Sequence, residues 1–163
     1  MELTSYKAED LFVLVTQAGE KFIMLDVSVN EQFDRFKVEG PFLSDMANVP
    51  YVEFVEHEEE SVARVPAAEK VRIVCAKEGS AKYVGEILMN HGFKDVRFLE
   101  GGIKTWGNML APKLVASDDL YQLFQFIRPG KASCSYGLIS NNEMVLFDPS
   151  RNAGFYQSFA ENN

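Results

Sequence analysis

The stretch of sequence that decides the fold is Val71-Arg72-Ile73-Val74-Cys75-Ala76-Lys77-Glu78-Gly79-Ser80-Ala81-Lys82. An apolar-rich run of strand type ends in a cysteine, a short loop of mostly small residues follows, and residues 83–90 have the pattern of a helix. A cysteine in this place lies among backbone N–H groups at the positive end of a helix, where a thiolate is favoured and anions bind. The sequence therefore predicts that Cys75 is a nucleophile.

Strand and helix patterns alternate from the start of the chain to about residue 112, the order typical of a parallel α/β fold. Short apolar runs predict buried strands at residues 21–27, 71–74 and 96–99, and a short strand at 47–50 that Pro50 ends. Periodic apolar residues and stop signals predict helical segments at residues 8–18, 31–36, 54–64, 82–91 and 103–109.

The pattern changes after Pro112. Strands are predicted at residues 124–128, 133–140 and 143–148, and Asn141-Asn142 indicates a hairpin between the last two. A final helical turn is predicted at 155–160. We therefore expect an α/β domain over residues 1–114 and a short β-rich segment over 115–163.

Composition narrows the range of functions. The chain has 163 residues and a net charge of −8, which argues against nucleic acid or an anionic membrane as a partner. Its two cysteines, Cys75 and Cys134, form neither a disulfide framework nor a zinc-binding pair. We see no signal peptide and no apolar run of membrane-spanning length, so we expect a cytoplasmic protein without cofactor or metal.

Several motifs occur in an order and at a spacing that resemble a rhodanese (sulfurtransferase) domain over about residues 4–112. They are Leu25-Asp26-Val27 with Glu31-Gln32-Phe33, Asn48-Val49-Pro50, Cys75 at the end of the central strand, Gly92-Phe93, and Glu100-Gly101-Gly102-Ile103 with Trp106. The resemblance implies a central parallel sheet flanked by helices, with Cys75 as the catalytic residue.

Sulfur transfer needs a thiolate that attacks a sulfane sulfur, holds it as a persulfide and passes it to an acceptor thiol. We expect the residues that follow Cys75 to bind the substrate and the persulfide through backbone N–H groups. These are Ala76, Lys77, Glu78, Gly79, Ser80 and Ala81. Asp26 is interpreted as a hydrogen-bond anchor for neighbouring loops, and Trp106 as a core residue.

The chain departs from the family pattern at two arginine positions. Many rhodaneses carry arginine where Ser28 and Ser80 stand here, and the loop glycine is one place later, at Gly79. Cationic side chains usually assist the thiosulfate dianion, so these departures favour a low-molecular-weight persulfide as the donor. They also motivate an alternative, a catalytically silent interaction or regulatory module of the same fold.

A phosphatase is the other enzyme class that uses a loop cysteine in this fold. Such enzymes need an arginine six residues after the cysteine to grip the phosphate with two hydrogen bonds. Here that residue is Ala81, and the loop holds no arginine. The sequence therefore argues against phosphatase activity.

Three other residues are expected to have no part in the chemistry. Cys134, between serines on a predicted strand, is expected to be a packed residue rather than a resolving thiol. His57 and His91 are expected to be surface or helix-end residues rather than bases.

The remainder of the chain resembles the opening strands of a metallo-β-lactamase-type domain. Phe126-Ile127-Arg128, Ser133-Cys134-Ser135-Tyr136-Gly137 and Phe147-Asp148-Pro149 carry this likeness. Both histidines precede the boundary, so that fold's metal site is not expected, and the second domain reads as truncated. Because rhodanese domains fused to this fold belong to persulfide dioxygenases, the resemblance implies a fused or separate dioxygenase partner. Exposed edges and apolar side chains of these strands are expected to pack on the first domain or form a homodimer.

Overall fold

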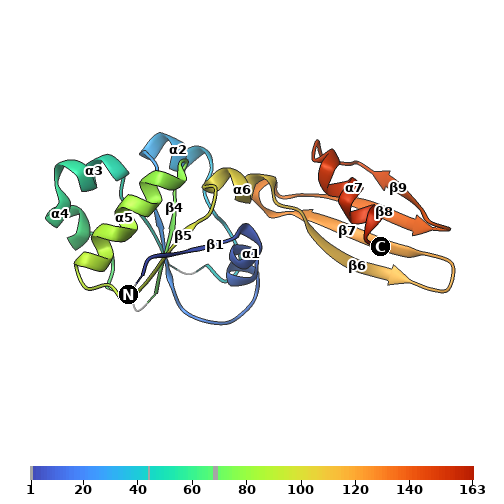
Figure 1. Cartoon of the computed structure of the whole chain (residues 1–163), viewed down its shortest axis with the longest axis horizontal. Coiled ribbons are helices and arrows are strands. Elements are labelled where there is room, and N and C mark those ends of the chain that lie inside the picture. Colours follow the sequence, from blue (N-terminus) through green and yellow to red (C-terminus); the bar gives the residue numbers. More distant parts are fainter. Residues whose placement is uncertain (1, 44, 68–69) are drawn as a thin grey trace. The chain divides into compact units, whose positions relative to one another are not determined.

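The computed structural model describes residues 2–43, 45–67 and 70–163, and the chain divides into two compact units, Met1–Trp106 and Gly107–Asn163 (Figure 1). This division lies earlier than the boundary expected near residue 114. The reason is that the first strand of the second sheet already begins at Ala111, soon after helix α6.

The first unit is a parallel α/β structure, as the sequence predicts. Its five strands pair in parallel in the order β1-β5-β4-β2-β3, so β4, which carries the cysteine at its end, lies at the centre. In chain order the elements are β1 (Thr4–Tyr6), α1 (Ala8–Thr16), β2 (Ile23–Asp26), α2 (Asn30–Arg35), β3 (Asp45–Asn48), α3 (Tyr51–Glu56), α4 (Glu58–Ala63), β4 (Lys70–Val74), α5 (Glu78–Asn90), β5 (Asp95–Leu99) and α6 (Ile103–Asn108).

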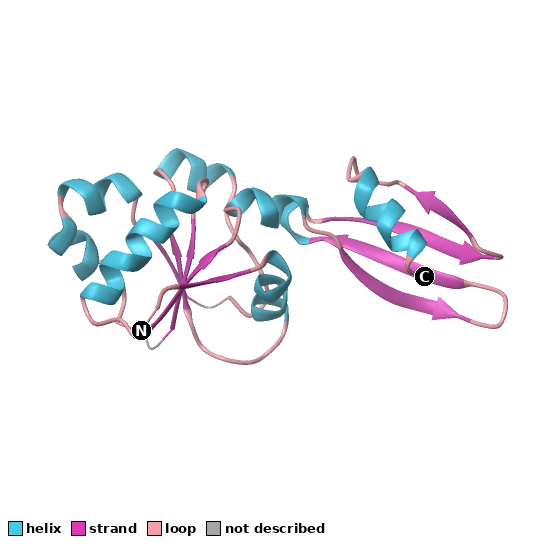
Figure 2. Cartoon of the chain, in the orientation of Figure 1, coloured by secondary structure: helices cyan, strands magenta, loops and turns pink. Residues whose placement is uncertain are grey.

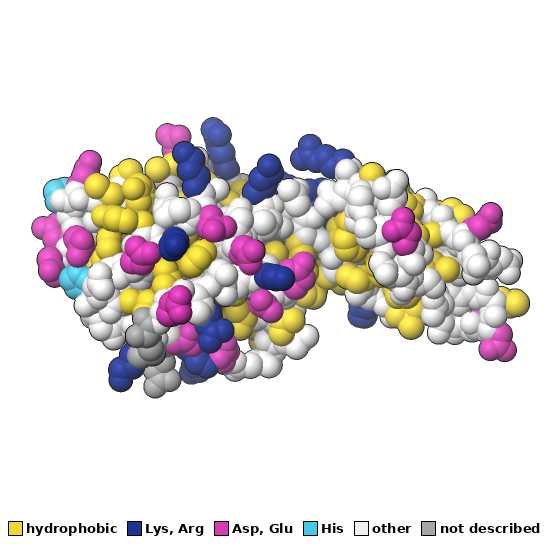
Figure 3. Space-filling view, in the orientation of Figure 1, with side chains coloured by type: hydrophobic (Ala, Val, Ile, Leu, Met, Phe, Trp, Pro, Cys, Tyr) yellow, Lys and Arg dark blue, Asp and Glu magenta, His cyan; other side chains and the backbone are white. Residues whose placement is uncertain are grey.

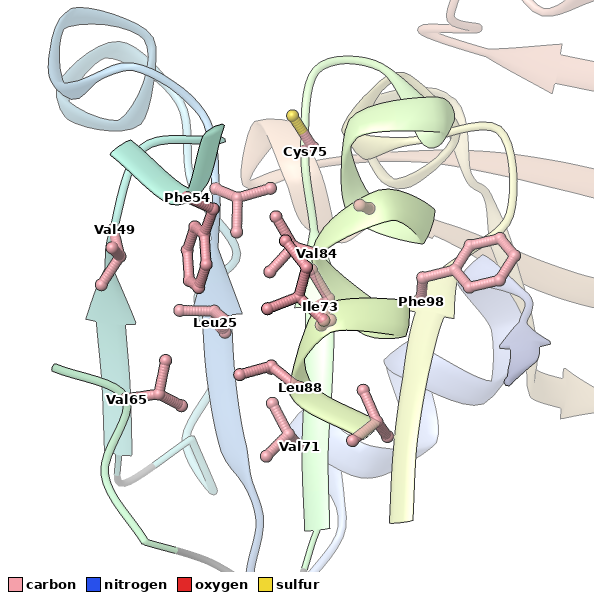
Figure 4. Close-up of a cluster of buried hydrophobic side chains, with 14 residues drawn as sticks. Leu25, Val49, Phe54, Val65, Val71, Ile73, Cys75, Val84, Leu88 and Phe98 are labelled. Carbon is pink, nitrogen blue, oxygen red and sulfur yellow. The ribbon is translucent and has the colours of Figure 1, made fainter. Parts of the chain in front are cut away.

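Burial on both faces of the central strands explains their nearly continuous apolar sequences. All four residues of β2 are buried, because helices lie on both sides of the sheet, α5 on one side and α1 on the other (Figures 1 and 2). On the α5 side, Ile73 of β4 packs in one cluster with Phe54 of α3 and Leu88 of α5 (Figure 4). This core supports the carboxyl edge of the sheet.

Several elements of the first unit differ from the sequence prediction. Strand β3 (Asp45–Asn48) lies two residues before the predicted 47–50 and ends before Pro50. Helix α5 begins at Glu78 rather than at Lys82, because Glu78 suits the positive end of a helix and Ala81 is fully buried. The helix predicted over 54–64 is two helices with a break at His57, where repulsion among closely spaced glutamates disfavours a continuous helix. The short strand β1, which pairs with β5, was missed.

The second unit is an antiparallel sheet of four strands with one helix. Its strands lie in the order β6-β7-β8-β9, and α7 covers one face (Figure 2). The elements are β6 (Ala111–Ser117), β7 (Gln122–Arg128), the 3-10 turn η1 (Pro129–Lys131), β8 (Ser133–Ser140), β9 (Glu143–Phe147) and α7 (Ala153–Glu161).

The hairpin between β8 and β9 has the predicted turn. Both turn residues, Asn141 and Asn142, have positive φ angles, of 50° and 62°, as the favoured two-residue hairpin turn requires. Strand β6 was not predicted, because Pro112 was interpreted as the end of the α/β pattern. Proline is tolerated there because β6 lies at the edge of the sheet.

Acidic side chains gather on α3 and α4, at the left of Figure 3. They include Glu53, Glu56, Glu58, Glu59 and Glu60, of which Glu53 pairs with Arg64 and Glu58 with His91. Within the described residues, no helix is both long and apolar enough to cross a bilayer.

Candidate active site at the end of strand β4

Cys75 immediately follows the last residue of β4, at the carboxyl edge of the parallel sheet. Its side chain stands at the end of the strand, beyond the apolar side chains of the core (Figure 4). The residue is only 5% exposed, and it belongs to the same buried cluster as Ile73 and Val84. Only a small part of the cysteine is therefore open to solvent.

Helix α5 starts three residues after Cys75. The first N–H groups of a helix have no partner within the helix and concentrate positive potential there. Lys77, Glu78 and Gly79 are exposed in this first turn and the residues before it, and Ser80 is half-buried. The backbone here can stabilise an anion next to Cys75 without any arginine.

Two of the six predicted loop residues have a different role in the structure. The Ala76 N–H donates a hydrogen bond to Ser28 Oγ at 3.2 Å, so this donor is engaged inside the protein rather than offered to a substrate. Ala81 is fully buried and packs in the core under α5. Both corrections follow from the early start of α5, which turns Ala81 inward and brings Ala76 against the end of β2.

Ser28 and Asp26 form a hydrogen-bonded support beneath the cysteine loop. The Ser28 N–H donates to Asp26 Oδ1 at 2.8 Å, and Asn48 Nδ2 donates to the carbonyl oxygens of Asp26 and Ser28, both at 2.9 Å. Because Ser28 also accepts from Ala76, the ends of β2, β3 and β4 are joined in one network. Asp26 thus holds the turn that contacts the loop.

Asp26 is fully buried, and its Oδ2 has no hydrogen-bond partner among the described atoms. Burial raises the pKa of Asp26, although hydrogen bonds from the backbone and side chain of Ser28 oppose that rise. The carboxyl group is therefore costly to ionise, which is consistent with a supporting position inside the protein.

Glu78 joins the start of α5 to the glycine turn that follows β5. Its Oε2 accepts a hydrogen bond from the Gly101 N–H at 2.5 Å. This carboxylate fixes the loop against the Gly101-Gly102 turn, and this hydrogen bond uses part of its acceptor capacity.

Gly102 passes close to the backbone of the cysteine loop. A Cβ atom at this position would lie 2.8 Å from the carbonyl oxygen of Cys75 and 3.1 Å from that of Ala76, and φ is +70°. The next residue, Ile103, donates its N–H to the Cys75 carbonyl at 2.8 Å. Glycine is therefore required here for the chain to pass the loop.

Gly79, by contrast, lies in helix α5, and a Cβ atom on it would contact nothing within 4 Å. The backbone conformation at Gly79 therefore does not require a glycine. Sequence reasoning missed the roles of Ser28 and Gly102, although the Gly-Gly motif marked the second one.

The remaining candidate residues belong to other elements. Cys134 belongs to the second unit and is exposed, which corrects its interpretation as a packed residue: it lies on the face of β8 that α7 does not cover. His91 ends α5, and its Nε2 lies 2.9 Å from Glu58 Oε1; His57 is exposed between α3 and α4. No group of three or more His, Cys, Asp or Glu residues that could hold a metal ion occurs within the described part of the chain.

Comparisons with known proteins cover the first unit. Residues 14–109 match the family model described as Rhodanese-like domain. A solved structure of an uncharacterized protein from Saccharomyces cerevisiae is 18% identical with a TM-score of 0.52, covering 65% of this chain and 92% of that one. A protein from Staphylococcus saprophyticus is 16% identical with a TM-score of 0.51, covering 64% and 94%. Both likenesses show that the fold of the first unit is shared.

A third solved structure is a larger protein. Reduced CoADR-RHD from Bacillus anthracis is 22% identical with a TM-score of 0.46, and the match covers 64% of this chain but only 16% of that protein. This chain therefore spans a small part of that protein's length. The search of curated proteins found no match.

Proposed function

The chain belongs to the rhodanese-like domain family, and from this premise we propose that it is a sulfurtransferase or persulfide carrier that works through Cys75. Members of the family are generally sulfurtransferases, and many are inactive. The observation that carries the proposal is the place of Cys75, directly between the central strand β4 and the first turn of α5. A thiolate and a persulfide anion are both stabilised there by backbone N–H groups.

The proposed reaction has two thiol-exchange steps. The Cys75 thiolate attacks the sulfane sulfur of the donor, the donor's S–S bond breaks, and a new S–S bond forms at Cys75 Sγ. The donor's other sulfur leaves as a thiolate, or as sulfite when the donor is thiosulfate. An acceptor thiolate then attacks the outer sulfur of the Cys75 persulfide and releases the Cys75 thiolate. Sulfur moves between thiols, and no external oxidant or reductant is needed.

We expect a low-molecular-weight persulfide to be a better donor than thiosulfate. Thiosulfate carries two negative charges, whereas the stretch after Cys75 offers backbone N–H groups, the two lysines Lys77 and Lys82, and the opposing carboxylate of Glu78. The positions where many rhodaneses carry arginine are Ser28 and Ser80. Of these, Ser28 is buried and bonded to Ala76.

We also infer a persulfide dioxygenase as the consumer of this sulfur, either fused or separate. This part of the proposal rests on the resemblance of the second unit to the opening strands of a metallo-β-lactamase-type domain. The antiparallel sheet with one helix on one face is compatible with that resemblance.

The experiment that tests the function is mass spectrometry of the intact protein after incubation with glutathione persulfide or thiosulfate. The wild type is expected to gain roughly 32 Da, the mass of one sulfur, and to lose it again on addition of a thiol. Cys75→Ser should gain nothing, and the matched variant Cys134→Ser should behave like the wild type. A wild type that neither donor modifies would contradict the proposal.

The second candidate is a catalytically silent interaction or regulatory module. The low exposure of Cys75 favours it, since a nucleophile must be reached by its substrate. Reaction of the folded protein with iodoacetamide at neutral pH separates the two: rapid alkylation of Cys75 supports catalysis, and alkylation of Cys134 alone supports the module.

A further inference from the structure

The four-stranded sheet of the second unit has one face that a helix covers and one face that it leaves uncovered. Residues opposite each other in antiparallel strands point to the same side of the sheet. One face therefore presents four cross-strand rows, and these rows are Ala111 with Ile127 and Cys134; Lys113 with Gln125, Tyr136 and Phe147; Ala116 with Leu123, Leu138 and Val145; and Ser140 with Glu143. We call this set of residues the outer face.

Helix α7 covers the opposite, inner face. Phe126 on that face is fully buried, with Tyr156 and Phe159 of α7 packed edge-on against it at ring distances of 5.2 and 4.9 Å. Phe124 and Leu146 join the same cluster. The helix thus accounts for the apolar residues of one face only.

The outer face keeps large apolar side chains exposed. Val145 is 55% exposed and Phe147 is 52% exposed, and their row neighbours Leu138 and Tyr136 are half-buried. An uncovered apolar sheet face of this kind marks an interaction site.

The polar groups of the outer face also suit a covered surface. Gln125 Nε2 donates to Tyr136 Oη at 2.9 Å, so the two central polar side chains satisfy each other within the face. The central strands β7 and β8 contribute no charged residue to it, and the two charges in its rows, Lys113 and Glu143, have opposite signs and lie on the edge strands β6 and β9. A chain of net charge −8 thus presents one surface without net negative charge, where two copies can meet without strong repulsion.

We propose that the outer face binds the outer face of a second copy of this chain, so that two sheets stack into a sandwich about a twofold axis. Stacked sheets pack about 10 Å apart, and a twofold interface uses the same patch on both copies. Four strands about 4.8 Å apart and about seven residues long give a face of roughly 20 by 23 Å. Two such faces enclose roughly 900 Å², near the lower limit of about 1,000 Å² for a specific interface. The dimer is therefore weak and depends on concentration.

The test is sedimentation velocity of the full chain over a hundredfold range of concentration that reaches the high micromolar. The wild type is expected to shift from monomer to dimer. Val145→Glu is expected to raise the dimer dissociation constant at least tenfold. The matched control is Val55→Glu on α3, because Val55 is 53% exposed and the substitution adds the same charge. This control should dimerise like the wild type.

Phe147→Glu supplies a second variant, and circular dichroism shows whether each variant is folded. Because the side chains of Val145 and Phe147 are more than half exposed, replacing them leaves no cavity in the core. A wild type that stays monomeric throughout would overturn the proposal, whether the face is covered by the first unit, by another protein or by nothing. A dimer that Val55→Glu weakens and Val145→Glu does not would overturn it as well.

Discussion

At the scale of single residues, the cysteine loop depends on the atoms that pack against its backbone. Cys75 and Ala76 are held by Ile103 and Ser28 through hydrogen bonds, and Gly102 passes close to their carbonyl oxygens. The geometry of the Cys75 loop is therefore set in part by residues that lie outside it in the sequence.

Gly102→Ala is expected to lower the free energy of unfolding by about 2 kcal/mol, because φ is +70° and the new Cβ would overlap the Cys75 carbonyl. Sulfur transfer, measured by the mass gain and its loss to a thiol, should slow at the same time. Gly79→Ala is the control: its Cβ meets nothing within 4 Å, and alanine favours the helix by about 1 kcal/mol. Equal stability of Gly102→Ala and wild type in urea titrations would contradict this account.

The place of Cys75 between a strand and a helix could be predicted from sequence, because a strand pattern, a cysteine and a helix pattern follow each other directly. The partner of its loop could not be recognised in that way. The bond from Ala76 to Ser28 joins residues 48 positions apart, and it exists only because β2 and β4 are neighbours in the sheet. In the sequence, Ser28 stood out only because many rhodaneses carry arginine at this position.

At the scale of elements, β4 and β5 are joined by a buried charge as well as by their backbones. Arg72 of β4 is 2% exposed, and its Nη1 and Nη2 donate to the two carboxylate oxygens of Asp95 at 2.9 and 3.1 Å. Arg97 also donates to Asp95, at 3.1 Å, and Glu20 lies 3.5 Å from Arg72. Burial raises the pKa of Asp95, but the hydrogen bonds and charge of Arg72 outweigh burial and lower that pKa overall.

Asp95→Asn is expected to lower the free energy of unfolding by about 2 kcal/mol at pH 7, because it removes the charge that balances Arg72. Because the pKa of Asp95 is lower in the folded protein, its ionised carboxylate stabilises the fold at pH values above the unfolded pKa of about 3.9. This stabilisation is lost as pH falls through the pKa of the folded state. The difference from wild type should therefore shrink as pH falls from about 4 to about 2. Urea titrations at several pH values measure it, with exposed Asp34→Asn as the control, and a difference that does not change with pH would contradict the prediction.

Elements with a strong apolar pattern were predictable, and elements made by tertiary context were not. The runs that became β2, β4 and β5 are buried on a parallel sheet, where a short continuous apolar sequence is the rule. Strand β6 carries Pro112 and mostly exposed residues, and it exists because β7 offers it an edge. The start of α5 was missed because Gly79 and Ser80 are poor helix formers.

At the scale of the whole molecule, the two units differ in how much apolar surface they cover. The first unit has a sheet with helices on both sides, whereas the second has a sheet with a helix on one face only (Figure 2). A small unit with one uncovered face buries less surface for each residue that it orders, so we expect it to be the less stable of the two.

This difference predicts two unfolding transitions in urea. The single tryptophan, Trp106, is fully buried in the first unit, so its fluorescence reports on that unit, while far-ultraviolet circular dichroism reports on both. The dichroism signal is expected to begin its loss at a lower urea concentration than the fluorescence change. Raising the protein concentration should move that early transition to higher urea, because dimerisation through the outer face stabilises the folded second unit. Val145→Glu should abolish this concentration dependence and leave the fluorescence transition unchanged. If the dichroism and fluorescence curves of the wild type coincide at every concentration, the two units unfold as one and the prediction is wrong.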